Sequence, residues 1–104
     1  MTTLVEANEE RYEVVKDPAA DLDYALSWVD WLPPGDVITA LAVRIEGPDA
    51  ALIAGSGGDS FTDDQTTSWL AGGTEGHQYR VIHKITTDNS RVTERTLYVQ
   101  IIDR

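Results

Sequence analysis

Two histidines are the side chains of this 104-residue chain best suited to metal binding or proton transfer. His77 and His83 are six residues apart, and on one strand that spacing separates them by roughly 20 Å, too far to share a zinc ion. His83 lies among the inward-phased residues of a predicted strand, where a buried, hydrogen-bonded histidine is favoured over a ligand or a general base. His77 lies in a glycine-rich segment, and we expect it to be solvated.

Aspartates are the second chemical feature of the sequence. They gather in two predicted loops, Asp17, Asp21 and Asp23 in the first and Asp59, Asp63 and Asp64 in the second. Neither group has the Asp-x-Asp-x-Asp-Gly spacing of a calcium-binding loop, so acidic loops that keep the protein soluble are favoured over a calcium site. Carboxylate pairs could also hydrolyse glycosides, but a chain this short offers no large cleft for them.

No other catalytic pattern is present in the sequence. It contains no Ser/His/Asp ordering, nucleophile elbow or phosphate-binding loop. The chain has no cysteine, which excludes thiol catalysis, thiolate zinc sites and iron–sulfur clusters. We therefore predict a protein that is not an enzyme, with no catalytic residue, no metal and no cofactor.

The charge and hydropathy of the chain limit its partners. Eighteen acidic and eight basic residues give a net charge of -10, which disfavours nucleic acid as a ligand. No run approaches the roughly 20 apolar residues of a membrane helix, and the N-terminus lacks the basic start and apolar stretch of a signal peptide. We expect synthesis in a cytoplasm and no membrane partner.

Alternation of apolar and polar residues predicts an all-β domain. Strands are predicted over 12–16, 22–29, 37–45, 50–54, 65–70, 78–87 and 92–102, with turn signals about every ten residues. About seven antiparallel strands without a helix favour an immunoglobulin-like β-sandwich over residues 12–104. Residues 1–11 contain three glutamates and are predicted to be a flexible acidic leader, or alternatively an arm that orders on a partner.

Strand phase predicts which side chains face the core. In the second strand the inward residues are Leu22, Tyr24, Leu26 and Trp28. In the third strand they are Val37, Thr39, Leu41, Val43 and Ile45.

Two loops have distinctive compositions. The segment 31–36 contains two prolines and a glycine, and we expect it to fold Trp31 and Leu32 over one end of the core. The alternative is that Trp28 and Trp31 form a sugar-stacking platform. The glycine-rich segment 55–59 is predicted to be a flexible loop, and 88–90 a tight hairpin turn.

The segment 69–85 is predicted to form a corner between the two sheets. Gly72, Gly73 and Gly76 permit backbone angles closed to other residues, so the chain can leave one sheet and enter the other. Tyr79 would lock this corner by sending its hydroxyl back to the backbone within residues 70–74, where Thr74 lies. Trp69 would face outward, which makes it a candidate contact for a partner.

Several segments together resemble the phage fibre-tail adaptor proteins, a family of small proteins of tailed bacteriophages and prophages. The segments are Lys16-Asp17-Pro18, Leu22-Asp23-Tyr24, Trp28 with Trp31-Leu32, Gly35-Asp36-Val37-Ile38, Trp69 to Gly76 with Tyr79, Ile85-Thr86-Thr87 and Thr93-Glu94-Arg95-Thr96. The sequence departs from the family at Ser90, where family members often have a glycine before the arginine.

The resemblance implies a noncatalytic component of the virion with an immunoglobulin-like sandwich. It would connect tail, fibre or baseplate proteins, be present in multiple copies, and be made in the cytoplasm of the bacterial host. An alternative is a carbohydrate-binding or host-adhesion module of the tail tip, which requires Trp28, Trp31 or Trp69 in an exposed groove. A further alternative, a small metal-assisted hydrolase, requires carboxylates converging with His83 in a pocket.

Overall fold

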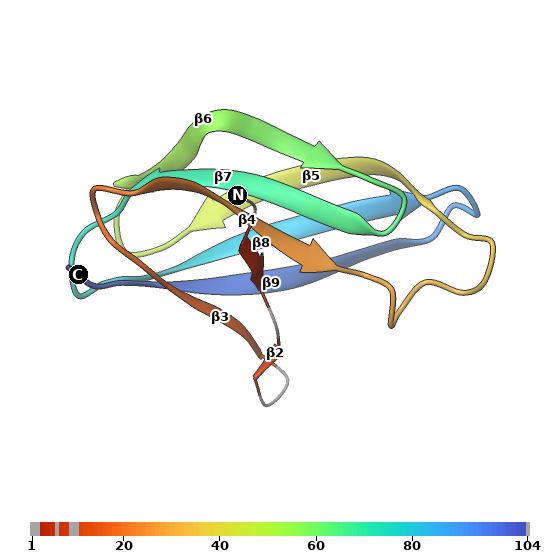
Figure 1. Cartoon of the computed structure of the whole chain (residues 1–104), viewed down its shortest axis with the longest axis horizontal. Coiled ribbons are helices and arrows are strands. Elements are labelled where there is room, and N and C mark those ends of the chain that lie inside the picture. The colour runs from red at the N-terminus through yellow and green to blue at the C-terminus, as the bar shows by residue number, and fades with distance from the viewer. Residues whose placement is uncertain (1–2, 6, 9–10, 104) are drawn as a thin grey trace.

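The computed structural model describes residues 3–5, 7–8 and 11–103, which form two stacked β-sheets (Figure 1). The strands are β1 (Thr3–Val5), β2 (Ala7–Asn8), β3 (Arg11–Lys16), β4 (Asp21–Ser27), β5 (Ile38–Glu46), β6 (Leu52–Phe61), β7 (Gln65–Gly72), β8 (Gln78–Thr87) and β9 (Val92–Ile101). These described residues contain no helix. The predicted all-β sandwich is confirmed, and its immunoglobulin-like topology remains a prediction.

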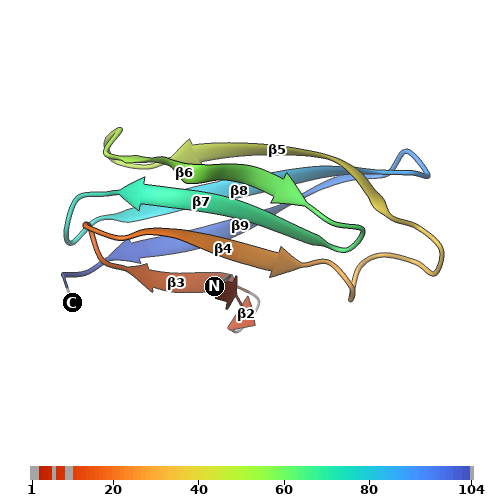
Figure 2. The same ribbon diagram turned by 45° about the horizontal axis from the view of Figure 1, so that its top comes forward.

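The sheets have four and five strands. The first has the order β1-β4-β7-β6 and the second β2-β3-β9-β8-β5, and Figure 2 shows the two layers. Neighbours run antiparallel except β1 with β4 and β3 with β9, which are parallel. The sequence predicted antiparallel strands throughout. β3 and β9 differ because they come from opposite ends of the chain and no hairpin joins them.

The predicted leader, residues 1–11, is described only in part. Residues 1–2, 6 and 9–10 lie outside the described residues. The backbone of β1 pairs with residues 24–26 of β4, and that of β2 pairs with the start of β3. The division into a leader and a domain from residue 12 remains a prediction.

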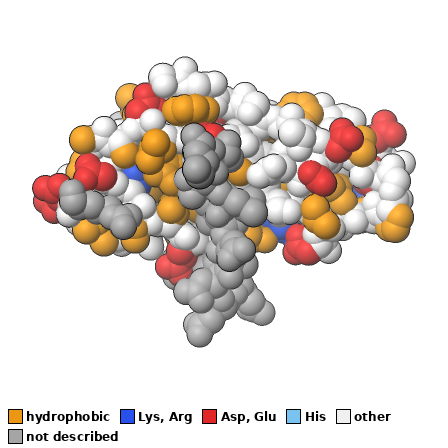
Figure 3. Space-filling view, viewed as in Figure 1, with side chains coloured by type: hydrophobic (Ala, Val, Ile, Leu, Met, Phe, Trp, Pro, Cys, Tyr) orange, Lys and Arg blue, Asp and Glu red, His pale blue; other side chains and the backbone are white. Residues whose placement is uncertain are grey.

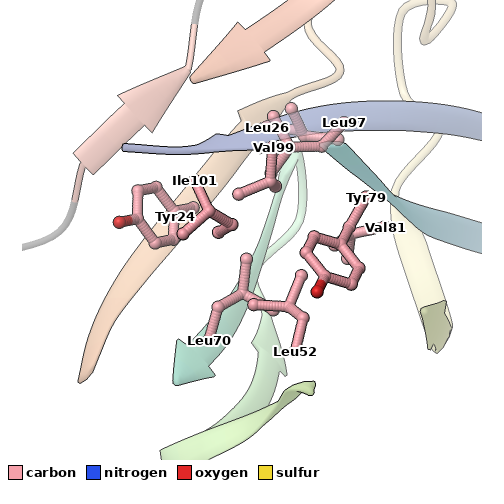
Figure 4. Close-up of a cluster of buried hydrophobic side chains, with 9 residues drawn as sticks. All are labelled: Tyr24, Leu26, Leu52, Leu70, Tyr79, Val81, Leu97, Val99 and Ile101. Carbon is pink, nitrogen blue, oxygen red and sulfur yellow. The ribbon is translucent and has the colours of Figure 1, made fainter. Parts of the chain in front are cut away.

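The core lies between the two sheets. Figure 4 shows its main cluster, in which Tyr24, Leu26, Leu52 and Leu70 of the four-stranded sheet meet Tyr79, Val81, Leu97, Val99 and Ile101 of the five-stranded sheet. A second cluster of Trp28, Ile38 and Ile85 fills one end, and Trp31 and Leu32 pack against it. The predicted fold of segment 31–36 over the core is therefore confirmed.

Strand phase was predicted correctly over most of β4 but not at its start. Tyr24, Leu26 and Trp28 are buried, whereas the side chain of Leu22 is 46% exposed. Leu22 pairs directly with the buried Leu70, so its side chain lies on the same, inward face of the sheet. It lies near the beginning of the strand, where we expect the cover from the opposite sheet to be incomplete.

The predicted phase of β5 is wrong at its start. Ile38 is buried, whereas Thr39 is exposed and Val37 is only half-buried. The register with β8 shifts between Ile38 and Ala40, so a β-bulge moves the inward phase to Leu41. Uniform alternation cannot anticipate such an extra residue.

The predicted flexible loop at 55–59 is also wrong, because these residues belong to β6. Ala54 pairs with Leu70 and Asp59 with Ser68, so four residues of β6 lie opposite Trp69 alone. Glycines suit this wide bulge because they allow the backbone to approach a neighbour closely. The composition that indicated flexibility instead serves close packing.

The turn between β8 and β9 places Ser90 in a left-handed conformation, with φ of 62°. The Ser90 N–H donates to the Thr87 carbonyl at 2.9 Å, which closes the predicted hairpin. A residue with a Cβ is strained at this φ, whereas glycine is not.

We predict that Ser90→Gly raises the free energy of unfolding by roughly 0.5–1 kcal/mol, because it removes this strain at a modest entropic cost. Urea denaturation followed by tryptophan fluorescence measures the change. Asn89→Gly, next in the same turn, is the matched control and should not stabilise the protein. A stability loss in Ser90→Gly would contradict the strain.

Candidate functional site

The corner between β7 and β8 joins the sheets at one end of the sandwich. The ring of Tyr79 is fully buried, and its hydroxyl accepts a hydrogen bond from the Thr74 N–H at 3.0 Å. The same hydroxyl donates to Oδ1 of Asp49 at 2.5 Å. Tyr79 therefore ties the corner to the turn between β5 and β6.

Asp49 is the acceptor at the centre of this corner, and it is not among the candidate residues that the sequence indicated. Its Oδ2 accepts from the Thr74 hydroxyl at 2.8 Å and lies 3.1 Å from Nδ1 of His77. Its Oδ1 also accepts from the Ala51 N–H at 2.9 Å. The hydrogen bond from Tyr79, then those from Ala51 and Thr74, lower the pKa of Asp49 to about 2. The bond to residue i+2 is an Asx turn, so the Pro-Asp pair at 48–49 was the available signal.

Lys16 holds the other side of the corner. Its side chain is buried, and the ammonium donates to the carbonyl of Gly72 at 2.7 Å and to that of Asp17 at 2.9 Å. Burial lowers the pKa of this amine. A lysine at the end of a strand carries no local signal for such a contact, because Gly72 lies 56 residues away in sequence.

The corner requires glycine at two adjacent positions. Gly72 has φ of 76° and Gly73 of 102°, in the left-handed region. A Cβ at Gly72 would overlap the carbonyl oxygen of Ala51, and one at Gly73 would overlap the side chain of Ile101. Both the turn and the close approach of neighbouring strands therefore depend on these glycines.

Trp69 lies on the outer face of the four-stranded sheet. Ser68 and Leu70 on either side of it are buried, whereas Trp69 is half-buried. A Cβ at Gly57 would overlap the indole ring, so the bulge of β6 rests directly on this side chain. Asp21 holds the bulge by accepting from the Ser56 N–H at 3.1 Å. Trp69 thus presents a fixed and partly accessible ring.

His83 is fully buried in the core, and both ring nitrogens have partners. Nδ1 lies 2.7 Å from the Thr66 hydroxyl and Nε2 lies 3.0 Å from the Ser68 hydroxyl. Thr66 also accepts from the indole N–H of Trp28 at 2.9 Å. Because a hydroxyl can both donate and accept, Thr66 links the indole of Trp28 to the imidazole of His83 within the core. Burial lowers the pKa of His83 to about 4.

The aspartates predicted in two loops do not converge. Across the part of the chain that the structure describes, no three His, Asp or Glu side chains are grouped closely enough to hold a metal ion. Asp21 instead anchors the β6 bulge. A metal-assisted hydrolase would need carboxylates beside His83, but the neighbours of its ring nitrogens are the hydroxyls of Thr66 and Ser68.

Trp28, one of the pair proposed as a sugar-stacking platform, belongs to the core, and Trp31 packs against it. Trp28 is fully buried, and it forms a T-shaped pair with Trp31, with ring centroids 6.2 Å apart. Arg95 covers Trp28, with its guanidinium carbon 4.5 Å from the ring centroid, and both of its terminal nitrogens bind Asp30. These two tryptophans therefore form no open sugar platform.

Acidic residues outnumber basic ones by 18 to 8 in this chain. On the face shown in Figure 3, acidic side chains lie at both ends of the molecule and few basic side chains are visible. This distribution agrees with the net charge of -10 and offers phosphate groups no basic stripe. A helix that could cross a membrane does not occur in the described ranges.

We predict that Tyr79→Phe lowers the free energy of unfolding by about 1–2 kcal/mol, because the Asp49 carboxylate and the Thr74 N–H both lose a partner. Urea denaturation of this variant, of Asp49→Ala and of the double variant gives the coupling energy. The two effects should be less than additive. An unchanged unfolding midpoint for Tyr79→Phe would contradict the role of the corner.

We predict that His83 makes the protein less stable as the pH falls from 6.5 to about 4. In this window the unfolded chain binds a proton at His83 that the folded chain excludes, which costs up to about 3 kcal/mol of stability. The free energy of unfolding, measured against pH, should show this loss. His83→Gln should remove that part of the pH dependence, and an unchanged profile would contradict it.

Comparison with known proteins identifies the family. The family model described as "Podophage GP4 fiber-tail adaptor protein gp77" matches residues 16–100. Among solved structures, the cysteine protease inhibitor EhICP2 from Entamoeba histolytica is similar, with a TM-score of 0.53, 13% identity, and coverage of 96% of this chain and 94% of that one. At that identity it shows a shared fold alone. No curated protein sequence matches significantly. The chain therefore belongs to the podophage fiber-tail adaptor family.

Proposed function

We propose that this chain, a structural component of the phage tail, connects tail proteins to fibre or baseplate proteins, and that Trp69 contacts one of them. The family match over residues 16–100 carries the adaptor role. Trp69 supports the contact because it is the tryptophan that lies on the outer face of a sheet. Large aromatic side chains held rigidly at a surface are frequent anchors of protein interfaces.

The surroundings of Trp69 suit a protein partner. Ile53 is 54% exposed and pairs with Ala71, which is two residues from Trp69 on the same face of β7. These three side chains form an apolar patch on the outer face of the four-stranded sheet. The β6 bulge fixes the ring before docking, so little conformational freedom is lost on binding.

The placement of the polar residues supports a noncatalytic role. The residues that could have done chemistry instead stabilise the fold: His83 in the core, and His77 and Asp49 at the corner. We further propose that several copies occupy each particle and are made in the host cytoplasm. The net charge of -10 would keep unassembled copies apart until they dock.

We predict that Trp69→Ala reduces incorporation of the chain into particles, because the partner loses its aromatic anchor. Quantitative mass spectrometry of purified particles measures the copies retained. Val92→Ala is the matched control, because Val92 is 56% exposed and belongs to the other sheet. It should be incorporated like the unmodified chain.

Two results would count against this function. Absence of the unmodified chain from purified particles would contradict the adaptor role itself. Normal incorporation of Trp69→Ala would contradict the contact and leave the adaptor role intact. Because Trp69 also packs on Gly57, urea denaturation must show that the variant is folded.

A further inference from the structure

The outer edge of β5 is the longest regular strand edge that the described residues leave open. β5 ends the five-stranded sheet and has nine residues. The other edges are broken or covered: β6 carries the wide bulge, and the short β1 and β2 border β4 and β3. Proteins usually protect long edges, because open backbone groups pair with other chains.

The pairing of β8 shows which groups this edge presents. The Thr87 N–H donates to the carbonyl of Arg91 on the β9 side, and the Asp88 N–H donates to the carbonyl of Val37 on the β5 side. Successive residues of a strand direct their backbone groups to opposite sides, so the odd-numbered residues of β8 bond to β9 and the even-numbered ones to β5. Leu41, Val43 and Ile45 lie opposite odd-numbered residues of β8, and these pairs exchange no backbone hydrogen bonds.

The backbone N–H and C=O groups of Leu41, Val43 and Ile45 therefore point away from the sheet. Within the described ranges, none of these groups takes part in a hydrogen bond outside the regular strand pairing. They form a ladder of three donors and three acceptors across residues 41–45. That pattern matches the backbone of one extended strand.

The side chains around this ladder leave room for a neighbour. Ala40 and Ala42 line a shallow hollow on the outer face with Thr86 and Lys84 of β8. The first charged residue of β5 is Arg44, so its first six residues carry none of the charges that commonly protect edges. A larger side chain from an added strand could lie across the two alanines.

We propose that an extended segment of another virion protein adds to β5 as a sixth strand of this sheet, pairing with residues 41–45. This inference rests on the proposed adaptor function, which requires a protein partner. A second copy of the chain is a poorer occupant, because it would bring a further net charge of -10 to the contact. Backbone pairing would supply affinity, and the hollow beside Ala40 and Ala42 would select the side chain.

Val43→Pro tests the pairing, with Val43→Ala as its matched control. Both variants truncate a side chain that packs against the core, but only proline removes the outward N–H and places its ring at the edge. Proline at this position removes no bond to β8. Purified chains are added to particles of the encoding phage assembled without this chain, and the copies bound per particle are counted.

We expect the unmodified chain and Val43→Ala to bind these particles and Val43→Pro to lose binding while remaining folded. Equal binding of both variants would overturn the β5 proposal and leave the adaptor function standing. If the unmodified chain does not bind, both proposals fail. Analytical ultracentrifugation of the chain alone should show a monomer. A dimer abolished only by Val43→Pro would assign the edge to a second copy and overturn the choice of partner.

Hydrogen exchange of the unmodified chain gives a second test that needs no folded proline variant. In the free chain, the amides of Leu41, Val43 and Ile45 should exchange rapidly and those of Ala42 and Arg44 slowly. Binding to particles assembled without the chain should protect the first three. Continued rapid exchange of these three amides in the bound chain would overturn the proposal.

Discussion

The junction of the two sheets depends on the hydrogen bonds that the Asp49 carboxylate accepts at one end of the sandwich. This carboxylate accepts hydrogen bonds from the buried Tyr79 of one sheet and from Thr74 in the corner that leads out of the other. Lys16 holds the opposite side through the carbonyl of Gly72. Two charged side chains thus stabilise a backbone path that glycine alone makes sterically possible.

The two histidines serve the fold and are not set up for chemistry. His83 is hydrogen-bonded to two hydroxyls inside the core, and His77 contacts Asp49 at the corner. What stays available for partners is surface: the Trp69 patch on one sheet and the open β5 edge of the other. The two features lie on different sheets, so the proposed connecting function would let one small domain engage two proteins at once.

Much of the fold could be predicted from the sequence because strand alternation reports burial on each face. Tyr24, Leu26 and Trp28 followed that rule, as did the satisfied core position of His83. Alternation failed at the bulge after Ile38, and composition failed at the glycines that pack on Trp69, because the backbone is irregular at both places. The roles of Lys16 and Asp49 depend on residues distant in the chain, which local patterns cannot reveal.

A cryo-electron microscopy reconstruction of the assembled phage particle tests the central claim most directly. It should show this sandwich in the tail, between two different virion proteins, with an extended segment of one of them beside β5. The claim would be contradicted by a reconstruction of the complete tail in which no density fits the sandwich. Density for the sandwich that touches a single neighbouring protein would contradict the connecting role.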